Sequence, residues 1–157
     1  MRLPGTAARP ETWPSPAFTG RTNLAAQLRA QPPVLRRRGL RFLVSDLLWP
    51  GPPADVLQHL GAGAAALHIM QVLAETDLRP PDYGSLRVAD AETGEELDLF
   101  LDEAGRQRYC QALATHTAAW DDGCRRYRAT LHRLVAEELV RDWTPAELLR
   151  QGLLEGA

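Results

Sequence analysis

Three short stretches of the chain are almost continuously apolar, and each is bounded by glycine, proline or polar residues. They are Leu40–Asp46, Ala64–Leu73 and Ala129–Ala136. Apolar runs of this length are typical of parallel strands that are buried on both faces. We therefore predict three core strands at these positions.

Residues around these strands follow a helical period. Asn23–Arg38, Asp55–Leu60 and a long segment from Asp102 to about Tyr127 carry apolar residues at helical spacing. Thr22 and Asp102 are of the type that caps helix N-termini. Four helices are predicted in all, because Thr144-Pro145-Ala146-Glu147 forms a capping box that opens a last helix ending at Leu154.

Two local features bear on the continuity of the first helix and on the buried side of the long one. Pro32 and Pro33 should kink or divide the first one, which otherwise ends in Arg36-Arg37-Arg38 with Gly39 behind it. The long helix should bury a stripe that consists of Tyr109, Leu113, Trp120, Cys124 and Tyr127.

Between the second and third strands lies a pattern of a different kind. Ser85–Asp90 and Glu96–Leu101 are strand-like, and Glu92-Thr93-Gly94 between them has the composition of a hairpin turn with its glycine in the left-handed region. The predicted fold is therefore α/β: a partial doubly wound parallel sheet of about three core strands, with flanking helices and an inserted β-hairpin. The proline-rich residues 1–19 are predicted to be irregular, and residues 20–157 to form the domain.

Composition narrows the classes of partner. A length of 157 residues suits one domain, and a net charge of −2 gives no general attraction to nucleic acid or to anionic membranes. The longest apolar stretch, Ala62–Ala74, is too short to cross a bilayer, and the first residues do not resemble a signal peptide. Cys110 and Cys124 fall on one predicted helix about 21 Å apart, too far to bridge. We expect a cytoplasmic chain with reduced cysteines and no membrane segment.

The candidate functional residues lie where the predicted strands end. Ligands of open α/β sheets bind outside the carboxyl ends of the strands. Asp46 ends the first strand and Thr22 precedes the helix before it, so both should lie at that edge as oxygen donors of the kind that Mg²⁺ prefers. Trp49 follows in a proline-rich loop, where it is either an anchor for a partner or part of the core. Glu75, after the second strand, lies at the same edge.

An ordered set of motifs resembles the DUF58 family of domains of unknown function. In sequence order the motifs are Gly20-Arg21-Thr22-Asn23-Leu24, Arg36-Arg37-Arg38-Gly39-Leu40, Val44-Ser45-Asp46-Leu47, Val72-Leu73-Ala74-Glu75, Asp90-Ala91-Glu92-Thr93-Gly94-Glu95 and the helical positions Tyr109, Leu113 and His116. The resemblance covers about residues 19–154. The resemblance implies the C-terminal half of a von Willebrand factor A-like domain, a bacterial protein-binding domain that works with a MoxR-type AAA+ ATPase.

The resemblance also implies a metal-ion-dependent adhesion site, of which this sequence holds only a part. Thr22 matches its threonine and Asp46 its last aspartate, whereas the Asp-x-Ser-x-Ser motif of its first strand is absent from the sequence. We therefore expect no cofactor, with Mg²⁺ bound only if the missing half of the domain is supplied. The chain should be a non-catalytic protein-interaction domain with Trp49 and Glu75 at the partner surface.

One enzymatic alternative remains open, a small Mg²⁺-dependent hydrolase that uses Asp46 and Glu75 as paired carboxylates. Against it, the sequence has no nucleophile with a positioned base. The four histidines lack metal-ligand spacing, and His68 and His132, on strands, are expected to be hydrogen-bonded interior residues.

Strand order gives a last expectation. In the usual doubly wound order 3-2-1-4-5-6, the first and fourth strands are neighbours. The resemblance implies that Leu40–Ser45 is the fourth strand, which loses its neighbour when the first three are absent. Natural edge strands are usually blunted by charge or proline, and Arg41 is the sole charge on this one. The edge should therefore stay unpaired in the monomer, be covered by residues 1–19, or pair in a homo-oligomer.

Overall fold

The computed structural model describes residues 24–80, 83–89 and 94–142. A three-stranded parallel sheet forms its centre, in the order β1-β2-β5, with β1 at Leu40–Ser45, β2 at Ala66–Leu73 and β5 at Thr130–Val135. In the register, Phe42 is opposite His68, and Met70 is opposite His132. The predicted α/β class and the three core strands are confirmed.

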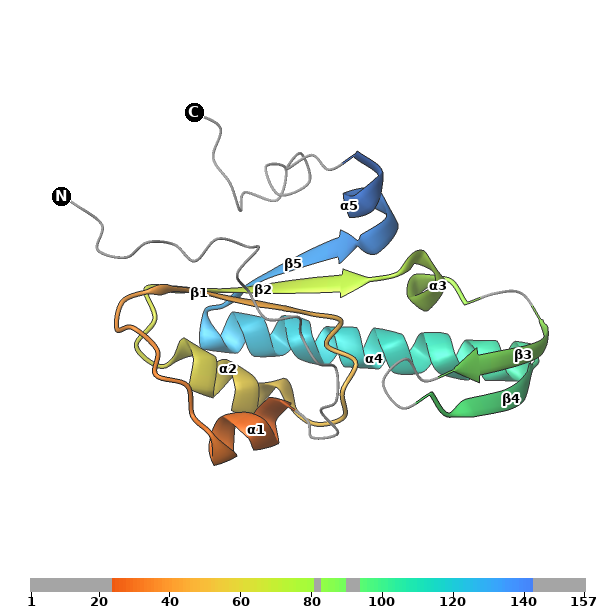
Figure 1. Ribbon diagram of the computed structural model, residues 1–157, viewed down its shortest axis with the longest axis horizontal. Helices are drawn as coiled ribbons and strands as arrows, with labels where there is room; N and C mark the ends of the chain where they lie inside the picture. The colour runs from red at the N-terminus through yellow and green to blue at the C-terminus, as the bar shows by residue number, and fades with distance from the viewer. Residues whose placement is uncertain (1–23, 81–82, 90–93, 143–157) are drawn as a thin grey trace.

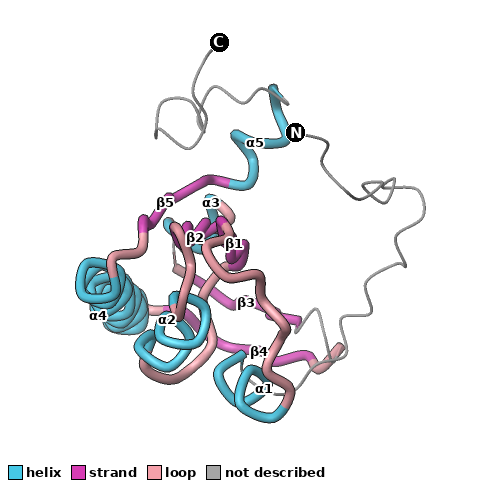
Figure 2. The backbone as a smooth tube through the Cα atoms, turned by 90° about the vertical axis from the view of Figure 1, so that its left-hand side faces the viewer, coloured by secondary structure: helices cyan, strands magenta, loops and turns pink. Residues whose placement is uncertain are grey.

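Helices cover one face of this sheet (Figure 1). They are α1 (Leu24–Ala30), α2 (Pro53–Gly61) and α4 (Glu103–Tyr127), and Figure 2 shows all three on the same side of β1 and β2. α2 approaches α4 closely, because a Cβ atom on Gly123 would lie 2.9 Å from Leu57 Cδ1. The core lies between these helices and the sheet, and its buried members are Ala25, Leu28, Leu47, Val56, Leu57, Leu67, Ile69, Trp120 and Cys124.

The opposite face of the sheet, here called the outer face, bears Leu40, Phe42 and Val44 on β1. Their alternation with the more buried Arg41, Leu43 and Ser45 follows the two-residue period of a strand. On β2, His68 belongs to the same face, since its ring stacks on Phe42 with centroids 5.2 Å apart. The outer face is therefore most exposed along β1, where the large apolar side chains reach solvent.

The inserted hairpin is confirmed as a separate two-stranded antiparallel sheet. β3 (Gly84–Ala89) pairs with β4 (Glu96–Leu101), and Gly94 has a φ of 72°, the left-handed conformation expected of it. Two short helices were not predicted from the sequence: α3 (Glu75–Leu78) after β2 and α5 (Ala136–Asp142) after β5.

The expected interruption of the first helix at Pro32 and Pro33 is confirmed, but the helix predicted to reach Arg38 does not resume after them. α1 stops at Ala30, and Gln31 N donates the last helical hydrogen bond to Gln27 O at 2.8 Å. Pro32 and Pro33 cause the stop, because a proline lacks the N–H of the next helical bond and restricts the residue before it. The three arginines after the prolines therefore lie in an exposed segment and not in a helical turn.

The predicted stripe of the long helix is correct only in its C-terminal half. Trp120 and Cys124 are buried, whereas Leu113 is half-buried and Tyr109 is exposed. α4 has 25 residues and is about 37 Å long. The eight residues of β2 span only about 26 Å. The N-terminal half of α4 therefore extends past the sheet toward the hairpin (Figure 1).

Candidate functional site at the carboxyl edge of the sheet

The loop that follows β1 is closed by its own side chains. Asp46 Oδ1 accepts a hydrogen bond from Leu48 N at 3.0 Å, and Ser45 Oγ accepts one from Leu47 N at 3.1 Å. Leu47 has a φ of 63°, a left-handed conformation that costs a leucine about 1 kcal/mol. Its fully buried side chain offsets that cost and anchors the turn, while the Asp46 side chain stays exposed.

Two polar side chains, one buried and one half-buried, hold the backbone of this loop. Gln71, only 1% exposed on β2, donates through Nε2 to Asp46 O at 3.1 Å. On α4, His116 Nε2 lies 2.7 Å from Leu47 O and 3.2 Å from Trp120 Nε1. One ring nitrogen cannot donate to a carbonyl and accept from an indole N–H at once, so the shorter contact assigns the proton to Nε2. The loop position is thus fixed by β2 and α4.

Trp49, in the same loop, combines core packing with partial exposure. Its ring meets that of Trp120 edge to face, with centroids 5.6 Å apart, which is a favourable arrangement of two aromatic rings. The side chain is half-buried against the core cluster. Trp49 is therefore held rigidly at the carboxyl edge. It follows the turn by two residues, counted from the buried Leu47 at the centre of the turn.

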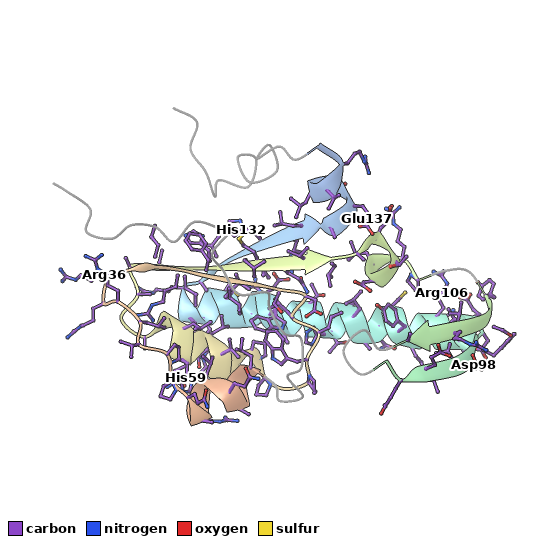
Figure 3. The ribbon with its side chains drawn as sticks, in the orientation of Figure 1. Arg36, His59, Asp98, Arg106, His132 and Glu137 are labelled. Atoms are coloured by element: carbon purple, nitrogen blue, oxygen red, sulfur yellow. The ribbon has the colours of Figure 1, made fainter. Side chains whose placement is uncertain are left out.

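Glu75 belongs to a different part of the edge. It is the first residue of α3, and its backbone N–H donates to Glu137 Oε2 at 2.9 Å. Glu137 is at the start of α5, directly after β5 (Figure 3). Glu75 and Glu137, with Arg79 and Arg141, line a shallow cavity of about 120 Å³. The carboxyl ends of β2 and β5 are therefore linked through a carboxylate that caps α3.

The sequence-predicted site residues thus occupy two places. Asp46 and Trp49 share the loop after β1, and Glu75 lies with Glu137 at the ends of β2 and β5. Thr22 is outside the described residues, as is the helix predicted from Thr144 to Leu154. The hydrogen bonds of Asp46 and Glu75 are made with separate partners.

Sequence reasoning overlooked three residues that shape the site. Glu137 follows a core strand in the same way as Asp46, so the rule that selected Asp46 also selects Glu137. Gln71 is a polar residue inside an apolar strand, which signals a specific buried partner. No local pattern indicates that His116 reaches Leu47, because that contact joins residues 69 positions apart.

On the outer face, away from this loop, two histidines contact each other. His68 Nδ1 and His132 Nε2 are 3.1 Å apart, across β2 and β5. His132 is 3% exposed, and Figure 3 labels it at the sheet. The expectation of a hydrogen-bonded interior residue is confirmed for His132, whereas His68 makes the same contact but is only half-buried.

Among residues 24–80, 83–89 and 94–142, no three or more histidine, cysteine, aspartate or glutamate side chains are grouped so that they could hold a metal ion. Within these same ranges no helix has the length and apolar character needed to cross a membrane.

One protein-family model matches most of this chain, including part of the candidate site. A family model described as "Protein of unknown function DUF58" matches residues 10–119, which include the loop after β1 and Glu75. No solved structure matches the chain at a significant level.

The similar curated proteins come from mycobacteria. An uncharacterized protein of Mycobacterium avium is 32% identical over 132 residues, covering 83% of this chain and 74% of that protein. Uncharacterized proteins of Mycobacterium bovis and Mycobacterium tuberculosis are 32% identical over 139 residues, covering 88% of this chain and 42% of theirs. The chain therefore spans less than half the length of these two relatives.

Proposed function

The chain belongs to the DUF58 family, and from that premise we propose that it is a non-catalytic, von Willebrand factor A-like domain that binds a protein partner. The partner surface is the loop after β1 at the carboxyl edge of the sheet. Glu75 forms a second contact point at the same edge. A cytoplasmic location is part of the proposal.

Trp49 is the observation that carries this proposal. Binding energy at protein interfaces concentrates in a few aromatic or arginine side chains that are held rigidly before binding. Trp49 is partly exposed and fixed against Trp120, and the exposed carboxylate of Asp46 lies on the same loop. An aromatic anchor beside a charged group gives a partner both apolar contact and orientation.

Metal binding by this chain alone is expected to be weak. Mg²⁺ requires near-octahedral oxygen coordination, and Thr22 and Asp46 would leave most positions to water. The Asp-x-Ser-x-Ser motif that would supply further oxygen ligands is absent from the sequence. Partner binding by this chain is therefore proposed to be independent of Mg²⁺.

A MoxR-type AAA+ ATPase is the proposed partner, on the strength of the family resemblance. The test measures binding of the purified chain to such an ATPase from the same genome, by calorimetry, with Mg²⁺ and with EDTA. Trp49→Ala should weaken binding by about tenfold or more, the usual effect of removing an interface anchor. Asp46→Ala should weaken it less, since an exposed charge contributes little.

Val140→Ser is the matched control, because Val140 is 65% exposed on α5, away from the loop. It should leave the affinity unchanged. Thermal unfolding of each variant completes the test. If Trp49→Ala lowers the melting temperature as much as Trp120→Ala does, Trp49 serves the core and the proposed surface is wrong. Unchanged binding by a folded Trp49→Ala protein would equally reject it.

A further inference from the structure

The exposed apolar residues of the sheet are concentrated on one strand. Leu40, Phe42 and Val44 of β1 are 65%, 54% and 61% exposed on the outer face. Within the described ranges, β1 pairs with β2 alone, so the same strand also has an unpaired edge. Parallel strands are normally covered on both faces, and unpaired edges are normally blunted.

Arg41 does not blunt this edge, although it is the sole charge within the strand. Its side chain is directed to the helix side, where the guanidinium donates to the carbonyl oxygens of Leu60 and of Ala62, the latter at 3.0 Å. It is only 9% exposed. The Arg41 guanidinium therefore binds carbonyl oxygens of its own chain, and its charge does not repel an added strand.

The sequence around β1 is complementary to itself when reversed. In an antiparallel pairing about Phe42, Phe42 is opposite its own copy, and Leu40 is opposite Val44. In that register Arg38, in the turn just before the strand with a φ of 55°, comes to the same end of the interface as Asp46 of the other copy, which lies just after the strand. Both charged residues are exposed. Apolar residues thus meet apolar residues, and each end pairs opposite charges.

Other pairings of two copies lack this match. A parallel, in-register pairing would set Arg38 beside Arg38 and Asp46 beside Asp46, which is unfavourable. A shift of one residue in the antiparallel pairing would put outer-face side chains opposite helix-face side chains. The antiparallel register about Phe42 also places a two-fold axis at that residue, which closes the assembly as a dimer.

From these observations we propose that β1 is a homodimer interface, in which it pairs antiparallel with β1 of a second copy of this chain. The dimer has one continuous six-stranded sheet. Phe42 of each copy lies at the two-fold axis, and Arg38 of each copy pairs with Asp46 of the other. The interface shares Asp46 with the Trp49 surface of the proposed function but does not depend on that function, because its test uses the pure chain without any ATPase.

Sedimentation equilibrium tests the association over a concentration series from about 1 µM to 1 mM, the range in which small interfaces dissociate. Val44→Lys should give a monomer throughout, because it puts a charge opposite Leu40 of the second copy. Val140→Lys is the control and should leave the dimer intact, since Val140 is as exposed but lies on α5.

Charge exchange tests the register. Arg38→Glu and Asp46→Arg should each weaken the dimer by roughly tenfold, because each turns two symmetric opposite-charge pairs into like-charge pairs. The double variant Arg38→Glu/Asp46→Arg should restore the affinity, since opposite charges face each other again. Failure of the double variant to recover, with circular dichroism showing a folded chain, would overturn the proposed register.

Cysteine cross-linking gives an independent measurement, in a Cys110→Ser background that removes the exposed thiol. Phe42→Cys should form a covalent dimer on oxidation, because directly opposed residues of antiparallel strands are about 4.5–5.5 Å apart at Cα, within disulfide range. Leu40→Cys should not, because its own copy would be roughly 13 Å away along the strand.

Two results would overturn the homodimer as a whole. One is a monomer at every concentration, which would assign the edge to another segment of the same chain or to a different protein. The other is an oligomer that Val44→Lys leaves intact, which would place the contact elsewhere.

Discussion

At the scale of single residues, position along α4 decides the chemistry of the two cysteines. Cys110 is exposed on the part of the helix that extends past the sheet, and Cys124 is buried beneath the sheet. Burial raises the pKa of the Cys124 thiol to about 11, because a thiolate is poorly solvated in the core. Cys124 therefore stays a thiol in neutral solution, and thiolates are the reactive form of cysteine.

This difference predicts selective labelling. Ellman's reagent at pH 8 should react quickly with one thiol per native chain, that of Cys110, and with Cys124 only after unfolding in guanidinium chloride. The Cys110→Ser variant should lose the fast reaction and keep the slow one. A fast reaction that persists in this variant would show that Cys124 is accessible in the native protein.

At the scale of elements, α4 is bounded by signals that the sequence displays. Asp102 Oδ1 accepts a hydrogen bond from Gly105 N at 2.6 Å at the start of the helix, and Arg128 closes its end with a left-handed φ of 55°. The Asp102 carboxylate also lies near the positive end of the helix dipole. The predicted cap is therefore present.

Removing the cap should destabilise the protein by a measurable amount. Asp102→Ala is expected to lower the free energy of unfolding by about 1 kcal/mol, since one N–H at the helix start loses its partner. Asp102→Asn keeps a capping oxygen and should cost much less. Urea titrations of the three proteins measure the difference, and equal losses for alanine and asparagine would mean that charge, not capping, stabilises this end.

Across the whole molecule, stability should be uneven. β2 is paired on both sides and contributes the buried Leu67 and Ile69 to the core. The β3–β4 hairpin has only its own two strands among the described ones, and its Leu97 and Phe100 are exposed. A two-stranded hairpin alone is marginally stable in water, so it depends on contacts such as the hydrogen bond from Tyr83 to Glu103 at the start of α4.

Amide hydrogen exchange should reveal this gradient. Amides of β2 are expected to exchange about a hundredfold or more slowly than those of β3 and β4, because their exchange requires larger-scale opening. Mass spectrometry of peptic fragments would measure both sets in one experiment. Hairpin amides as protected as those of β2 would contradict the prediction and indicate that another surface covers the hairpin.

The sequence by itself determined the kind and order of most elements. The three core strands, the inserted hairpin and the capped α4 follow from local patterns, since side-chain period, capping and turn chemistry act over a few residues. The same local reasoning overextended α1, because it continued the helix beyond Pro32 and Pro33 to the arginine run. It selected Asp46 and Trp49 from their place after a strand.

Only the tertiary structure decided which of these residues meet. The contact of His116 with Leu47, the packing of Trp49 on Trp120 and the bond from Glu75 to Glu137 join segments far apart in the chain. The burial of α4 was decided in the same way, by how far the helix extends beyond the sheet. Such contacts depend on how elements of given lengths pack together, and no local pattern of residues encodes that geometry.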